Sequence, residues 1–219
     1  MITVAEMAVR ARGLVAGSER AVLAIVGAPG AGKSTLVDAL LRELRAGSPI
    51  AAGRQDWLAH LPMDGFHLSD VELDRLGRRD RKGAIDTFDS AGYAATVRRL
   101  VERTDEIVYA PGFERDLEQP IAAAIAIPRA AQLILTEGLY LLHDDGDWAK
   151  AARCFSESWF VSIDDDIRRE RLVARHVAYG KSVGAAEDWV ELVDEPNARL
   201  VAGSRSRATM LLDLTGWST

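Results

Sequence analysis

The chain has 219 residues, of which 48% are hydrophobic, and this suits one folded domain with a sizeable core. Its formal net charge of −6 argues against general nucleic-acid binding, which usually requires a basic face. The single cysteine excludes an internal disulfide. Because no apolar run reaches about 18 residues, and Glu6 and Arg10 spoil a signal peptide, we expect a cytoplasmic protein without a membrane partner.

The hydrophobic pattern predicts an alternation of helices and strands along the chain. Thr3 and Glu6 form a capping box that would open a first helix at about 3–17. Further helices are expected at 33–45, 68–76, 90–102, 165–179 and 185–201, the last with a bend or break at Pro196. Strands are expected at 21–26, 57–63, 106–110, 121–127, 131–136, 158–163 and 209–214. This order predicts an α/β fold with a mostly parallel sheet and helices on both faces.

A glycine-rich segment with the spacing G-x-x-x-x-G-K-[ST] directly follows the first predicted strand. Its residues are Gly27, Ala28, Pro29, Gly30, Ala31, Gly32, Lys33, Ser34 and Thr35. A plain glycine turn before a helix is the alternative, but the fixed spacing and the strand–helix context favour a phosphate-binding P-loop. Lys33 would then reach the β- and γ-phosphates of ATP, and Ser34 would place its hydroxyl on Mg²⁺.

Four of the predicted strands end at the P-loop or at a carboxylate, namely at Gly27, Asp64, Glu137 and Asp164. Ligands of parallel sheets collect at these carboxyl ends. Asp64 could accept the proton of an attacking hydroxyl, or it could simply belong to an Asp-Gly turn. Glu137 could hold Mg²⁺, more readily through water because it is a glutamate, or it could be a turn carboxylate.

A late helix carries arginines at i, i+3 and i+7, namely Arg168, Arg171 and Arg175. They share one helix face, which could close over a triphosphate and stabilise its charge. The alternative is a solvated face paired with acidic neighbours. His67 lies three residues after Asp64 and is the histidine best placed to contact a substrate.

Four further segments follow the P-loop along the chain in a familiar order. They are Met63–His67, Arg81–Asp89, Thr136–Tyr140 and Asn197–Ala208. Together they resemble the uridine kinase, pantothenate kinase and phosphoribulokinase group of P-loop kinases, with the small bacterial nucleoside or nucleotide kinase-like members most similar. The resemblance covers roughly residues 20–214 and implies the three-layer P-loop NTPase fold. It also implies one kinase domain over 1–219 with a helical lid at about 165–182.

The resemblance assigns roles to particular residues of this sequence. Asp64 occupies the family's catalytic base position, and Arg171 and Arg175 fall in the lid helix that closes on ATP. The stretches that border the acceptor pocket contain Lys82, Tyr93, Arg115 and Tyr140.

Two departures from the family pattern fall near the acceptor side. Glu114 stands where related sequences often have aspartate, and Leu139 stands where they often have asparagine. Because a shared fold does not settle the substrate, the acceptor cannot be carried over by analogy.

These patterns predict an ATP-dependent kinase that uses Mg²⁺ and phosphorylates a hydroxyl of a small metabolite, such as a nucleoside, a pantothenate-like acid or a sugar. The alternatives are a P-loop hydrolase that acts as a partner-dependent switch, and a nucleotide-binding protein without chemistry. A GTPase would need an Asn-Lys-x-Asp motif, whereas the only asparagine, Asn197, is followed by Ala198. The sequence leaves the oligomeric state open, with a homodimer as one option.

Overall fold

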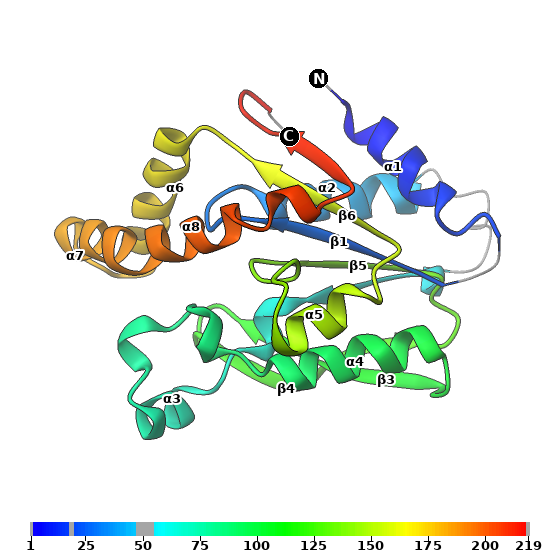
Figure 1. The fold of residues 1–219 in the computed structure, drawn as a ribbon, viewed down its shortest axis with the longest axis horizontal. Coiled ribbons are helices and arrows are strands. Elements are labelled where there is room, and N and C mark those ends of the chain that lie inside the picture. The colour runs from blue at the N-terminus through cyan, green and yellow to red at the C-terminus, as the bar shows by residue number, and fades with distance from the viewer. Residues whose placement is uncertain (1, 18–19, 47–54, 218–219) are drawn as a thin grey trace.

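A computed structural model describes residues 2–17, 20–46 and 55–217. Its centre is a five-stranded sheet with the order β2-β5-β1-β6-β7, in which all neighbouring strands are parallel (Figure 1). The strands are β1 (Ala21–Gly27), β2 (Leu58–Pro62), β5 (Leu133–Gly138), β6 (Glu157–Ser162) and β7 (Met210–Asp213). The predicted mostly parallel α/β fold is therefore confirmed.

Helices cover both faces of this sheet because the central strands are apolar on both sides. In β1, Leu23 and Ile25 face one core cluster, whereas Val22 and Ala24 face the other, as the two-residue period of a strand requires. The first cluster includes residues of α1 (Val4–Gly13) and α2 (Lys33–Ala46), and the second those of α4 (Ser90–Glu102) and α5 (Gly146–Ala152). Figure 1 shows these two helical layers with the sheet between them.

The remaining two strands depart from the predicted alternation. β3 (Ile107–Glu114) and β4 (Gln119–Pro128) form an antiparallel hairpin that is a separate two-stranded sheet. The expectation that helices and strands alternate throughout is wrong here, because the short link between β3 and β4 cannot hold the crossover that parallel strands require. The hairpin packs closely on the turn after β2, since a Cβ on Gly65 would lie 2.2 Å from the carbonyl oxygen of Pro111.

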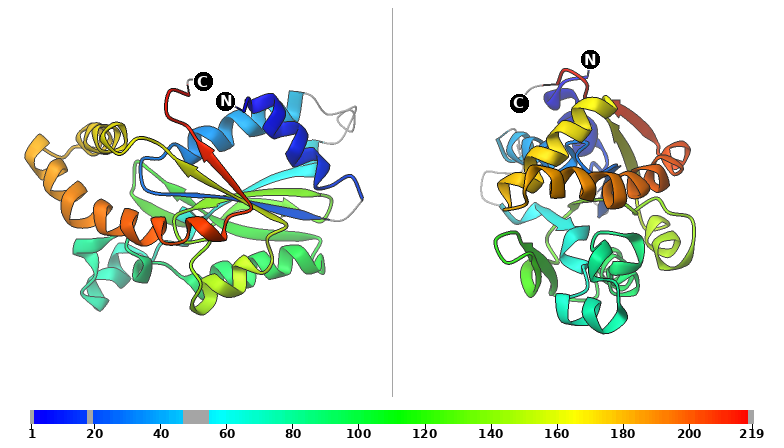
Figure 2. Two further views of the ribbon diagram at one scale, coloured as in Figure 1. Left: turned by 45° about the horizontal axis from the view of Figure 1, so that its top comes forward. Right: turned by 90° about the vertical axis from the view of Figure 1, so that its left-hand side faces the viewer.

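Three consecutive helices form the end of the molecule beyond the carboxyl ends of the strands, and Figure 2 shows them projecting past the sheet. They are α6 (Asp165–Ala178), α7 (Val183–Trp189) and α8 (Glu195–Ala202). The break predicted near Pro196 is present as a π-helical turn over Val190–Asp194. Proline in the first turn of α8 removes a backbone donor, so a regular ladder cannot run through it. None of the helices in the described ranges has the length and apolar character needed to cross a membrane.

Two shorter features match their sequence signals closely. The capping box at Thr3 and Glu6 is formed in both directions. The helix α3 (Asp70–Leu76) ends at Gly77, which adopts the left-handed conformation (φ 64°) that glycine tolerates. Local capping chemistry therefore accounts for these two boundaries.

Candidate active site

A cavity of about 720 Å³ lies at the carboxyl ends of the parallel strands. Its walls come from the P-loop, the turn after β2 with the segment that follows it, the β3–β4 hairpin, and the helices α6–α8. The predicted site residues in its lining are Pro29, Gly30, Lys33, Ser34, Asp64, His67, Lys82, Arg115, Glu137 and Arg175. The fold thus brings most of the predicted site residues to one place.

The P-loop is a backbone structure whose shape depends on two glycines. Gly30 and Gly32 have φ values of 75° and 89°, which residues with a side chain rarely adopt. Gly30 is also tightly enclosed, because a Cβ there would lie 2.8 Å from the side chain of Leu172 on α6. The loop leads directly into α2, which begins at Lys33, so the positive end of that helix adds to the anion site.

Lys33 is held inside this loop. Its side chain is buried, and Nζ donates a hydrogen bond to the carbonyl oxygen of Ala28 at 3.0 Å. Burial lowers the pKa of Lys33, while the negative charges of Glu137 and Asp64 act in the opposite direction. Lys33 therefore lines the same cavity as the carboxylates of Glu137 and Asp64.

Ser34 and Glu137 provide neighbouring oxygen atoms beside the loop. The hydroxyl of Ser34 donates to Oε1 of Glu137 at 3.4 Å, and both residues line the cavity. Glu137 lies inside β5, one strand away from the P-loop, where its residue partner in β1 is Ile25. Burial raises the pKa of Glu137 to about 7, and the nearby charge of Asp64 adds to this effect while Lys33 opposes it.

Asp64 is positioned by the turn Met63–Phe66 that follows β2. Its carbonyl oxygen lies 2.8 Å from Nδ1 of His67, which fixes the imidazole beside it. The His67 ring packs on Phe88 and Phe113, with centroid distances of 4.0 and 5.0 Å. Burial lowers the pKa of His67, so this histidine is a neutral hydrogen-bonding group at neutral pH.

The opposite wall of the cavity is ionic. Lys82 donates to Oδ1 of Asp70 at 2.6 Å and also to the backbone carbonyl of Glu118. Nη2 of Arg79 lies 2.7 Å from the other carboxylate oxygen of Asp70. One carboxylate therefore holds two cations that line the cavity.

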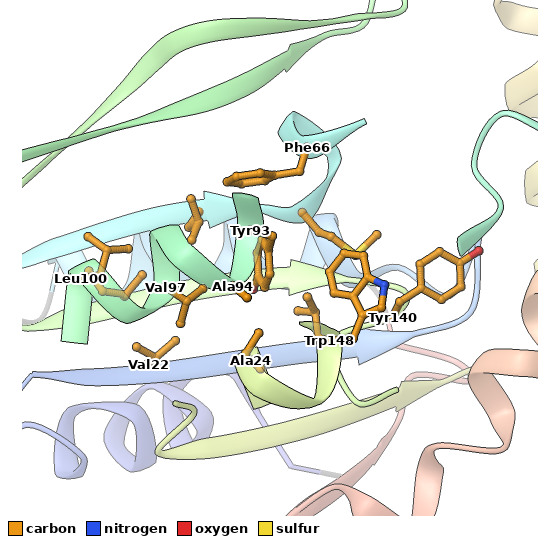
Figure 3. Close-up of a cluster of buried hydrophobic side chains, with 14 of the residues drawn as sticks. Val22, Ala24, Phe66, Tyr93, Ala94, Val97, Leu100, Tyr140 and Trp148 are labelled. Atoms are coloured by element: carbon orange, nitrogen blue, oxygen red, sulfur yellow. The ribbon is translucent and has the colours of Figure 1, made fainter. Parts of the chain in front are cut away.

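Two predicted substrate residues do not reach the cavity wall. Tyr93 is fully buried in the core between Phe66 and Trp148, at ring-centroid distances of 5.2 and 5.4 Å (Figure 3), and its hydroxyl shares a 2.7 Å hydrogen bond with Thr136. This corrects its predicted place beside the acceptor pocket, because residue 93 lies on the inward face of α4. Tyr140 is also buried, and its hydroxyl donates to the carbonyl oxygen of Gly83 at 2.7 Å, so it supports the wall from behind.

The three arginines of α6 have different environments. Arg175 lines the cavity. Arg171 is exposed and lies beside the P-loop, with Nη1 3.8 Å from where a Cβ on Gly32 would stand. Arg168 is 3% exposed and pairs with Asp165 and Glu195, so it stabilises the helix packing.

The strand-end carboxylate Asp164 also has a structural role. It is the N-cap of α6, and its side chain accepts hydrogen bonds from the backbone of Asp166 and Ile167. It does not belong to the cavity lining. The helix macrodipole and the free amides explain why an acidic residue stands there.

Several lining residues were not predicted from the sequence. They are Asp70, Arg79, Phe113, Glu118, His176, Lys181, Trp189, Asp194 and Asn197. They lie in loops and in the late helices, where no fixed spacing marks them. A signal was available for one of them, since Asn197 begins the segment Asn197–Ala208 that carries part of the family resemblance.

The sheet is parallel, and a glycine loop joins β1 to α2, with Lys33, Ser34 and Glu137 around it. This arrangement defines a P-loop fold that binds nucleoside triphosphates. No family model matches the sequence. A protein of Aspergillus versicolor named "ATP-dependent kinase-like protein notR'" is 38% identical over 152 residues, which cover 65% of this chain and 88% of that protein. A Schizosaccharomyces pombe protein named "Putative uridine kinase" is 31% identical over 191 residues, which cover 84% of this chain and 78% of that protein.

A solved structure supports the same grouping. The "putative fructose transport system kinase" from Silicibacter sp. TM1040 superposes with a TM-score of 0.84 and 30% identity, covering 97% of this chain and all of that one. The chain therefore belongs to the P-loop kinases of the uridine kinase, pantothenate kinase and phosphoribulokinase group.

Proposed function

We propose that this kinase transfers the γ-phosphate of ATP to a hydroxyl group of a small metabolite. The observation that carries the proposal is that the P-loop and Asp64 line one cavity, together with a polar wall that contains Lys82 and Arg115. Phosphoryl transfer requires a phosphate cradle and a group that positions the attacking hydroxyl. Both are within this single cavity.

In the proposed reaction Asp64 orients the acceptor hydroxyl and accepts its proton. The acceptor oxygen forms a bond to the γ-phosphorus, the bond from that phosphorus to the β–γ bridging oxygen breaks, and ADP leaves. Lys33 and Arg175 neutralise charge on the phosphates, and Arg171 reaches the nucleotide from the side of the P-loop. Such preorganised charges stabilise a transition state more than they stabilise the bound substrate.

Mg²⁺ fits beside the P-loop, because the hydroxyl of Ser34 and the carboxylate of Glu137 offer the oxygen ligands that this hard cation prefers. When bound, the ion would neutralise negative charge on the phosphate oxygens. Ser34 and Glu137 would be the residues that hold the ion, each through a side-chain oxygen.

The acceptor wall favours a molecule with several hydroxyl groups. Lys82 supplies hydrogen-bond donors, and Phe113 adds an aromatic surface. Asp64 and Asp70 supply acceptors, as does Nε2 of the neutral His67, because the proton on its Nδ1 is donated to the carbonyl oxygen of Asp64. Such alternation of donors, acceptors and an apolar face suits sugars and nucleosides. The names of two similar proteins mention uridine and a fructose transport system, so nucleosides and sugars, with pantothenate-like acids, belong in the screen.

The test is a screen of hydroxylated acceptors with coupled detection of ADP. We expect ADP release that depends on one acceptor class, and Asp64→Asn should reduce turnover by about 10²-fold or more while ATP affinity stays nearly unchanged. Asp164→Asn is the matched control, because it changes a strand-end aspartate that lies outside the cavity. ADP release that requires a protein partner in place of an acceptor would favour a P-loop hydrolase that acts as a switch. Normal turnover of Asp64→Asn would show that Asp64 takes no part in the mechanism.

A further inference from the structure

A short run of buried polar residues marks the start of α8. Asp194, Glu195 and Asn197 are 7%, 5% and 8% exposed. Burying such groups is unfavourable unless each finds a partner. All three are paired, and their partners lie in two different parts of the protein.

The partners of Asp194 and Glu195 are on α6. Nε2 of His176 donates to Asp194 at 2.7 Å. Glu195 accepts hydrogen bonds from Arg168 and from Arg169, the latter at 3.0 Å. The start of α8 is therefore fixed to the helix that carries the predicted lid arginines.

The same helix packs directly on the P-loop. A Cβ on Gly30 would lie 2.8 Å from the side chain of Leu172 and 3.0 Å from the carbonyl oxygen of Arg168. No space separates the loop from α6, so a ligand that tightens the loop must also bear on α6. Close packing transmits such displacements because protein interiors are not compressible.

The partner of Asn197 is on the acceptor wall. Nδ2 of Asn197 donates to the carbonyl oxygen of Gly83 at 3.3 Å, and the hydroxyl of Tyr140 donates to the same oxygen at 2.7 Å. Gly83 directly follows Lys82, whose ammonium group lines the cavity. The contact of Asn197 thus joins α8 to the backbone that positions Lys82.

We propose that Asn197 is a positioning residue that couples the nucleotide site to the acceptor wall. Binding of nucleotide at the P-loop holds α6 and the start of α8 in place, and the hydrogen bond from Asn197 then orders the segment 78–87 that carries Lys82. The site would be completed on its acceptor side only after ATP has bound. This inference rests on the proposed function in one respect, namely that the P-loop binds ATP.

The experiment measures hydrogen–deuterium exchange of the full chain with and without the ATP analogue AMP-PNP and Mg²⁺. We expect the analogue to slow exchange in the P-loop and in α6, and also in 78–87 by about fivefold or more, which is the lower range for coupling between sites. Asn197→Asp keeps the side-chain shape but removes the donor. In this variant the slowing in 78–87 should be lost, while the slowing in the P-loop and α6 remains.

Two controls separate coupling from general damage. Arg199→Ala changes an exposed residue of the same helix and should keep the wild-type response. Tyr140→Phe removes the other donor to Gly83, so 78–87 should exchange faster in both states but still respond to the analogue. If Asn197→Asp does not fold, Asn197→Ala replaces it, since alanine also removes the donor and adds no charge.

The outcomes are distinct. The coupling would be overturned if the analogue slowed hydrogen exchange in 78–87 equally in the wild type and in the Asn197 variants. It would also be overturned if the analogue slowed exchange in the P-loop of the wild type but not in 78–87. Absence of any slowing in the P-loop of the wild type would instead contradict the proposed function. The coupling is supported if Asn197→Asp loses the analogue-dependent slowing of exchange in 78–87 and keeps it in the P-loop and α6.

Discussion

The two halves of the cavity are built in different ways. The phosphate half is a continuous stretch of backbone, shaped by Gly30 and Gly32 and followed at once by a helix. The acceptor half is assembled from ionised side chains, such as Lys82 and Asp70, and from a hairpin that lies outside the main sheet. The phosphate half is formed by backbone and depends on local sequence, whereas the acceptor half is formed by side chains that the whole fold brings together. The two halves should therefore respond differently to substitution.

The largest effect should come from the phosphate half. Lys33→Met keeps the length of the side chain but removes its charge, and we expect turnover to fall by about 10²- to 10³-fold because the phosphates lose a preorganised cation. Steady-state ADP release and titration with a fluorescent ATP analogue measure this. Lys150→Met is the control, since Lys150 is 64% exposed on α5. Undiminished turnover would mean that the P-loop lysine does not serve phosphoryl transfer.

The phosphate half could be predicted from the sequence because its determinants are adjacent. Fixed spacing after an apolar strand gave the loop, and the helix from Lys33 followed at the expected residue. Glu137 could be placed as well, because parallel strands end at one edge and β5 directly neighbours β1. Its position inside β5 was not foreseen, since the apolar run ends before it.

A smaller and more selective effect should come from the acceptor half. Asp70→Asn leaves Lys82 and Arg79 without their shared charge partner, so both cations lose their fixed positions. We expect the KM for the acceptor to rise by about tenfold, with the KM for ATP unchanged, as for the loss of charge-assisted hydrogen bonds. Asp105→Asn, which removes an exposed ion pair with Arg99 outside the cavity lining, is the control. An equal rise in both KM values would show that the two halves are not separable in this way.

The acceptor half could be predicted only in part. The motif around Lys82 named the segment, but its partners Asp70 and Glu118 come from other elements and carry no spacing signal. The hairpin was expected as two further strands of one sheet, because apolar periodicity cannot tell which sheet a strand joins.

The smallest effect concerns a residue that the sequence assigned to the acceptor pocket and the structure places in the core. Tyr93→Phe removes the hydrogen bond to Thr136, so the free energy of unfolding should fall by about 1 kcal/mol. The KM for the acceptor should stay the same. Urea denaturation and the acceptor assay test the two parts, with Tyr109→Phe on the exposed side of the hairpin as the control. If the KM for the acceptor rose while the free energy of unfolding stayed the same, Tyr93 would have to act in the acceptor pocket.

The β3–β4 hairpin has a consequence for how enzymes of this build can change. It contributes Phe113, Arg115 and Glu118 to the cavity, yet among the described strands it pairs only within itself. Its tip, between Glu114 and Gln119, can therefore gain or lose residues without altering the register of any strand in the central sheet. Changes in the hairpin can therefore alter the acceptor that the enzyme binds while the phosphate-binding site and its chemistry stay the same.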